Sequence, residues 1–215
     1  MDTTPEQILL TIFFLTIVML HIVKKNSGTA ILYGLQSLTV VLLLVHTFAA
    51  TRDISILIIA ALLLIVKVIL APSFFLRLIR KHELKFSVST YVNLPLTLVM
   101  VTVLTAIAHS QVFGPLINHI PANQQYLSLS LAALFISLFL IVNRKGALSQ
   151  IVGILSLENC IVAFALFAGL EQSPALQIGV LFDISVWIII ASVFITMIHR
   201  HFGTLDVTEM RHLKE

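Results

Sequence analysis

Runs of about 20 apolar residues recur along the whole 215-residue sequence, and this repetition constrains the fold more than any other feature. Seven such runs are predicted to cross a bilayer, at residues 8–23, 29–50, 54–76, 88–108, 126–142, 147–170 and 176–198. The apolar residues are continuous rather than alternating, and a segment in lipid must satisfy its own backbone hydrogen bonds, so these spans are predicted to be helices. The sequence therefore predicts an all-α, polytopic membrane protein with a single membrane domain over residues 1–215.

The basic residues are unevenly distributed between the two sides of the predicted helices. Eleven of the 13 fall on one side, namely Lys24, Lys25, Arg77, Arg80, Lys81, Lys85, Arg144, Lys145, Arg200, Arg211 and Lys214. The other side carries Arg52, and Lys67 lies within a span. Because basic loops remain in the cytoplasm, the N-terminus is predicted outside and residues 202–215 are predicted to form a cytoplasmic tail. The net charge of +3 then reflects topology, and no nucleic-acid partner is expected.

An internal repeat emerges when the sequence is shifted by 119 positions against itself. Gly34 then aligns with Gly153, Ser37 with Ser156, and Lys25 with Arg144. This pattern predicts two parallel three-helix units, 8–82 and 126–201, on either side of an extra helix at 88–108. Parallel repeats occur in transport-type membrane proteins, although apolar helices also give chance matches.

Three charged side chains lie inside the predicted spans: Lys67, Glu158 and Asp183. Such residues cost a few kcal/mol near the bilayer centre, usually face the bundle interior, and often mark ion or proton pathways. Glu158 and Asp183 are predicted at similar depth on neighbouring helices, with Lys67 nearer the cytoplasmic side. These three are the candidate proton or ion pathway. The alternative is a static ion pair that fixes helix packing.

Other polar residues in the spans are candidates for supporting roles. Gln36, Ser156 and Asn159 are expected to bond between helices or to hold water, unless they only stabilise packing. Pro72 and Pro95 are predicted to interrupt their helices. Since the sequence has no Gly-rich phosphate loop, nucleophile elbow, cysteine cluster or metal-ligand spacing, we expect no catalytic centre, cofactor or metal in this chain.

Several short motifs resemble those of the hydrogenase-4 component E family. They are Arg144-Lys145-Gly146-Ala147-Leu148, the stretch from Gly153 to Asn159, Leu32-Tyr33-Gly34-Leu35-Gln36-Ser37, and Gly203-Thr204-Leu205-Asp206-Val207 in the tail. The resemblance implies a membrane-arm subunit of group 4 [NiFe]-hydrogenase complexes such as formate hydrogenlyase, which are related to respiratory complex I.

The second half also resembles the small K-type subunit of complex I, in which two membrane glutamates lie on the proton-conducting axis. Glu158 lies one helical turn later than an ungapped match places the first glutamate, and Asp183 stands for the second.

This resemblance implies a non-catalytic subunit in the bacterial or archaeal inner membrane, bound to antiporter-like and other membrane subunits. Its charged residues would contribute to proton or cation translocation coupled to redox chemistry elsewhere in the complex. Two alternatives remain open: a purely structural scaffold joining antiporter-like subunits, and a small subunit of a multisubunit cation/proton antiporter.

Overall fold

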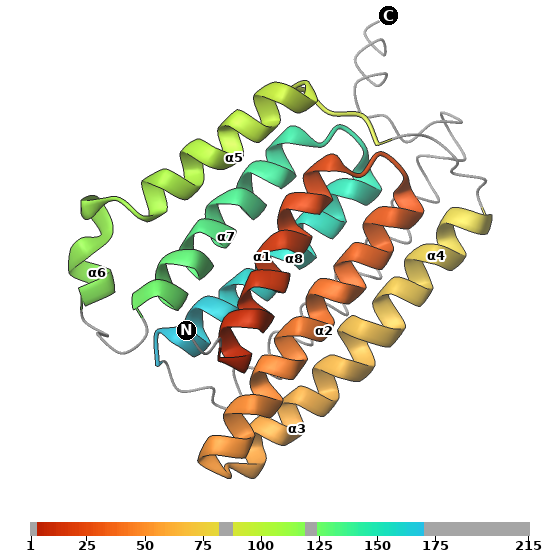
Figure 1. Ribbon diagram of the computed structural model, residues 1–215. Coiled ribbons are helices and arrows are strands. Elements are labelled where there is room, and N and C mark those ends of the chain that lie inside the picture. Colours follow the sequence, from red (N-terminus) through yellow and green to blue (C-terminus); the bar gives the residue numbers. More distant parts are fainter. Residues whose placement is uncertain (1–3, 82–87, 119–123, 170–215) are drawn as a thin grey trace, which may run out of the picture.

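The computed structural model describes residues 4–81, 88–118 and 124–169, and these residues form a helical bundle (Figure 1). Its elements in chain order are α1 (Pro5–Ile22), α2 (Asn26–Thr51), α3 (Ile54–Leu63), the π-helix η1 (Leu64–Leu70), α4 (Ala71–Lys81), α5 (Leu94–Ala108), the 3₁₀ helix η2 (Gln111–Phe113), α6 (Gly114–Asn118), α7 (Gln124–Asn143) and α8 (Ala147–Phe167). Within these ranges the chain forms no β-strand, and the extended pairing is limited to a bridge between Thr90 and Arg144.

Five helical stretches are long and apolar enough to cross a membrane: Pro5–Ile22, Asn26–Thr51, Ile54–Arg80, Gln124–Asn143 and Ala147–Phe167. A bent pair, Leu94–Ala108 with Gln111–Ile117, makes a sixth if its two parts form one broken span. The prediction of an all-helical chain is therefore confirmed for the described residues, and five of their helices are candidate membrane spans. The span predicted at 176–198 and the tail at 202–215 lie outside the described residues.

The helix predicted at 88–108 is shorter than expected, since residues 88–93 are not helical. The backbone N–H of Val88 donates to the carbonyl of Lys24, and that of Tyr91 to the carbonyl of Asn143 at 3.0 Å. This non-helical segment thus lies between the α1–α2 and α7–α8 connections.

Asn93 caps the start of α5 by accepting from the Leu96 N–H at 3.1 Å. Pro95 occupies the first turn, where its missing N–H costs no hydrogen bond. Pro95 therefore starts α5, and the prediction that it interrupts a helix was wrong. With 15 residues, α5 spans about 22 Å, less than the ~30 Å of a bilayer core.

Helix α8 packs against both α7 and α2. In Figure 1, α5, α7, α1, α2 and the α3–α4 helix follow one another across the bundle, and α8 lies behind them. Two glycines allow close helix contacts. A Cβ on Gly34 would lie 3.1 Å from Pro72 Cγ of α4, and one on Gly153 would lie 2.9 Å from Ile141 Cγ1 of α7.

These two glycines occupy matching positions in the predicted repeat. The third helix of the second unit is outside the described residues, so the repeat and its boundaries stay a prediction.

The two ends of the bundle differ in charge. The α1–α2 connection, the α7–α8 connection and the end of α4 share one end, which we call the basic end (Figure 1). Its described basic residues are Lys24, Lys25, Arg77, Arg80, Lys81, Arg144 and Lys145. At the opposite end, Thr4 Oγ1 bonds to the Tyr126 hydroxyl at 2.8 Å, and Glu6 lies 3.2 Å from His46.

Candidate functional site

Lys67 lies at the centre of the Ile54–Arg80 helix, about 20 Å from each end. It belongs to the π-helix η1, in which each backbone N–H bonds to the carbonyl five residues earlier rather than four. The Ala71 N–H, for example, bonds to the carbonyl of Val66. Pro72 follows directly and has no N–H to donate to the preceding turn. The helix continues past Pro72 rather than breaking, so the predicted interruption takes the form of a π-helical turn. Such turns are frequent at functional sites.

The Lys67 ammonium contacts two side chains of α8. Its Nζ donates to Asn159 Oδ1 at 3.1 Å and lies 3.5 Å from Glu158 Oε2. The Lys67 side chain is 1% exposed and that of Glu158 is 14% exposed. Glu158 is also near the middle of its helix, about 14–16 Å from either end, so the pair lies near the middle of both helices.

A hydrogen-bond chain extends from this pair into α2. Asn159 Nδ2 donates to Ser37 Oγ at 2.9 Å, and Ser37 Oγ donates to the carbonyl of Tyr33 at 3.0 Å. A lysine ammonium can only donate, so the Asn159 amide oxygen must face Lys67 and its nitrogen must face α2. The cluster therefore connects three helical segments: η1, α8 and α2.

Gln36 and Ser156 are completely buried. Gln36 Nε2 lies 3.9 Å from Cys160 Sγ, within range of a weak hydrogen bond. Gln36 Oε1 and Ser156 Oγ have no hydrogen-bond partner in the described part of the chain. Buried polar atoms of this kind are usually satisfied by internal water.

The structure thus brings together three of the predicted site residues, and it shifts the position of Lys67 along its helix. Lys67 contacts Glu158 and Asn159, with Ser37 completing the chain; Asp183 lies outside the described residues. Lys67 lies at the middle of its helix and beside Glu158, whereas the predicted span 54–76 placed it past the middle. The reason is that the helix runs to Arg80 instead of ending at residue 76, which moves its midpoint to Lys67.

Sequence reasoning did not single out Ser37 or Arg144 as site residues. Ser37 had one signal, its alignment with Ser156 in the predicted repeat. Arg144 was interpreted only as a loop charge, yet it is 1% exposed. Its guanidinium donates to the carbonyls of Leu20 and, at 3.3 Å, Val23, at the C-terminal end of α1. Burial lowers the pKa of Arg144 to about 10, so it remains charged at neutral pH and complements the helix dipole.

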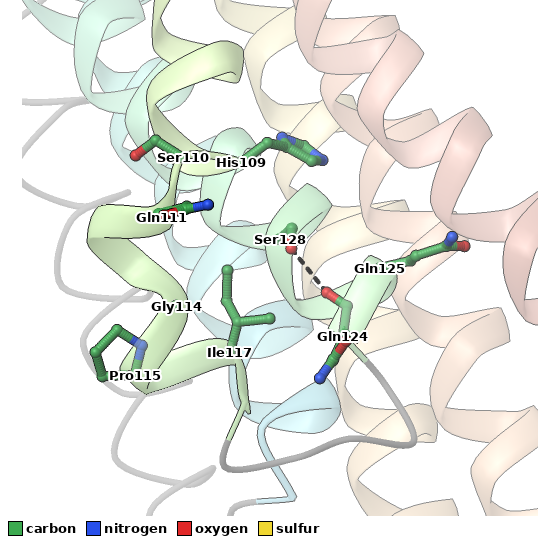
Figure 2. A pocket seen from close by; sticks show the side chains of 9 residues that line it. All are labelled: His109, Ser110, Gln111, Gly114, Pro115, Ile117, Gln124, Gln125 and Ser128. Carbon is green, nitrogen blue, oxygen red and sulfur yellow. Dashed lines mark hydrogen bonds between the residues drawn. The ribbon is translucent and has the colours of Figure 1, made fainter.

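A cavity lies at the end opposite to the basic end, between the α5–α6 bend and α7 (Figure 2). This cavity of about 590 Å³ is lined by His109, Ser110, Gln111, Gly114, Pro115, Ile117, Gln124, Gln125 and Ser128. None of these described lining residues is Asp, Glu, Lys or Arg. Across residues 4–81, 88–118 and 124–169, no group of three His, Cys, Asp or Glu side chains is placed to hold a metal ion.

Comparison with known proteins gives one informative similarity. No family model matches the chain, and no solved structure matches it. The uncharacterized protein Rv0085 of Mycobacterium tuberculosis (strain ATCC 25618 / H37Rv) is 29% identical over 102 residues, covering 47% of this chain and 43% of that protein. The match thus spans less than half of either protein, and the relative's name assigns it no activity.

Proposed function

We propose that this chain is a non-catalytic membrane subunit of a larger hydrogenase-4-like complex related to complex I. In this proposal its buried charges contribute to proton or cation translocation, coupled to redox chemistry in other subunits. The motifs around Arg144–Asn159 support the family, and antiporter-like membrane subunits are the proposed partners. The chain lies in the bacterial or archaeal inner membrane, with the basic end in the cytoplasm and the N-terminus outside.

The observation that carries the proposal is the Lys67–Glu158 pair near the middle of two candidate membrane spans. Ionised groups are costly there and are kept mainly where they serve transport or pair with one another. The Nζ–Oε2 distance of 3.5 Å is longer than an ideal charge-assisted hydrogen bond, and the shorter contact of Lys67 is to the neutral Asn159. Lys67 therefore has an alternative acceptor when Glu158 changes its protonation state.

The buried polar atoms near this pair support a path for protons. Gln36 Oε1 and Ser156 Oγ are acceptors suited to internal water, on α2 and α8 respectively. Water held there would extend the chain that runs from Lys67 through Asn159 to Ser37. Asp183 is the proposed next carboxyl on this path.

The test is proton translocation by inverted membrane vesicles, measured together with the yield of assembled complex. Glu158→Gln keeps the shape and hydrogen-bonding capacity of the side chain but cannot release a proton, so it should suppress translocation while the complex assembles. Glu158→Asp should have a milder effect. Glu6→Gln is the matched control, since Glu6 is a carboxylate at the end of the bundle, and it should translocate normally. Normal translocation by an assembled Glu158→Gln complex would overturn the proposal.

The structural scaffold is the second candidate, because the same pair also fixes α8 against η1. In that case Glu158→Gln reduces the yield of the complex, and adding Lys67→Met restores both yield and translocation. Mass spectrometry of the complex purified through this chain tests the partners. Hydrogenase and iron–sulfur subunits are expected, whereas a complex of antiporter-like subunits alone would support the multisubunit antiporter.

Topology is tested separately by labelling single cysteines with an impermeant reagent. A cysteine at Arg52 should be labelled from outside, and one at Lys145 only after permeabilisation. The reverse pattern would contradict the orientation.

A further inference from the structure

A cavity of about 250 Å³ opens at the basic end, separate from the Lys67–Glu158 site. Its polar lining comes from the end of α1, the non-helical 88–93 segment, the start of α5 and the α7–α8 connection. The lining residues that matter are His21, Lys24, Thr90, Asn93, Thr97 and Arg144. Positive and hydrogen-bonding groups from four parts of the chain thus surround one cavity.

The electrostatics of this cavity favour an anion. Lys24 and Arg144 line it, and none of the three described carboxylates does. The carboxylates of the described residues lie elsewhere: Glu6 and Asp53 at the opposite end, and Glu158 near the middle of α8. Asn93 is the N-cap of α5, so the positive end of that helix dipole also faces the cavity. Arg144 uses its donors to Leu20 and Val23 and still has further N–H groups available, because a guanidinium carries five.

His21 supplies an independent indication of a ligand. It is 4% exposed, and its Nε2 donates to the carbonyl of Ile136 at 3.1 Å, since a carbonyl can only accept. Its Nδ1 has no hydrogen-bond partner among the described residues. In the neutral ring this nitrogen is an acceptor, which is suited to a hydroxyl group. The residues that line the cavity therefore include cationic groups suited to a phosphate and a buried acceptor suited to a hydroxyl.

We propose that this cavity binds the phosphate of an anionic phospholipid headgroup that also carries a hydroxyl, such as that of phosphatidylglycerol. The basic end of a membrane-spanning bundle lies at the lipid–water interface, where basic pockets between helices bind anionic headgroups. A volume of 250 Å³, that of about eight waters in the liquid, accommodates a headgroup and leaves the acyl chains in the bilayer. Bound there, the lipid connects α1, α5 and the α7–α8 connection.

The test is native mass spectrometry of the full chain, with the subunits that accompany it, after delipidation in detergent. Phosphatidylglycerol, phosphatidic acid, phosphatidylcholine and inorganic phosphate are added separately, and affinity is obtained from the bound fraction. Phosphatidylglycerol should bind most tightly. Lys24→Gln should weaken it about fivefold, the effect of one basic residue near a membrane surface. Lys25→Gln is the matched control, because Lys25 is exposed next to Lys24 but does not line the cavity.

A third variant tests the hydroxyl. His21→Phe keeps an aromatic ring stacked on Phe139 and should remove the preference for phosphatidylglycerol over phosphatidic acid. Equal binding of phosphatidylcholine and phosphatidylglycerol, or equal losses in Lys24→Gln and Lys25→Gln, would overturn the site. Binding of inorganic phosphate as tight as that of the lipid would overturn a lipid as the source of the phosphate.

Discussion

The Lys67–Glu158 pair predicts a strong energetic coupling between η1 and α8. Removing one partner of a buried ion pair typically costs 3–5 kcal/mol, and Glu158→Gln should be at the lower end, about 3 kcal/mol, because glutamine retains an acceptor near the Lys67 ammonium. Lys67→Met should cost about 2 kcal/mol, since it removes the ammonium that lies 3.5 Å from Glu158 and donates to Asn159 Oδ1. Glu158 is 14% exposed against 1% for Lys67, so the remaining carboxylate has better access to water than the remaining ammonium.

The double variant distinguishes coupling from independent effects. Independent effects would add to about 5 kcal/mol, whereas the uncharged Glu158→Gln/Lys67→Met protein should lose only about 2 kcal/mol, a coupling energy of about 3 kcal/mol. The assay is unfolding of the purified protein in mixed micelles, followed by loss of helical circular dichroism, with Glu6→Gln as the control. Additivity to within about 0.5 kcal/mol would refute the argument that these side chains form a coupled pair.

Four further outcomes are expected from the same structure. Arg144→Gln should lower the free energy of unfolding by about 2 kcal/mol, because it removes charge-assisted bonds to the carbonyls of Leu20 and Val23; wild-type stability would show that these contacts contribute nothing. Gly153→Ala should destabilise by about 1–3 kcal/mol by pressing α8 against Ile141, and an unchanged unfolding midpoint would contradict that close contact. Arg52→Gly should stabilise by up to about 1 kcal/mol, since Arg52 ends α2 with φ 59°, and a loss of stability would argue against that backbone conformation. Cys160 is fully buried and should react with a maleimide only after unfolding in dodecyl sulfate; rapid labelling of the folded protein would place it at the surface.

The sequence predicts some of the helix ends from capping residues alone. Thr4, Asp53 and Asn93 each cap a helix through a side-chain oxygen, and such residues before apolar runs are start signals. Asn93 with Pro95 marks the start of α5, whereas hydropathy predicts a start at residue 88, because hydropathy alone does not separate a helix from a non-helical segment. Residues 88–93 are not helical, and their backbone groups bond instead to two distant connections, at Lys24 and at Asn143.

The sequence does not predict which side chains meet between helices. The choice of Lys67, Glu158 and Asn159 followed from the cost of polar groups in lipid, yet nothing local to either segment indicated that Lys67 meets Glu158 and Asn159 across more than 90 residues of sequence. Nor did the sequence distinguish Arg144, which is buried against α1, from Lys145 beside it, whose ammonium lies over the Tyr91 ring.

The sequence by itself determined that the chain is helical and lies in a membrane, because a continuous apolar run in lipid has no other way to satisfy its backbone. Only the tertiary structure decided which faces of those helices meet. In a soluble helix the polar side marks the surface, whereas here Leu42 faces outward and Leu44 is fully buried, and both are leucine. When lipid and protein interior are equally apolar, the pattern of hydrophobic residues no longer encodes packing, and small residues such as Gly153 and polar contacts such as Lys67–Asn159 select the arrangement instead.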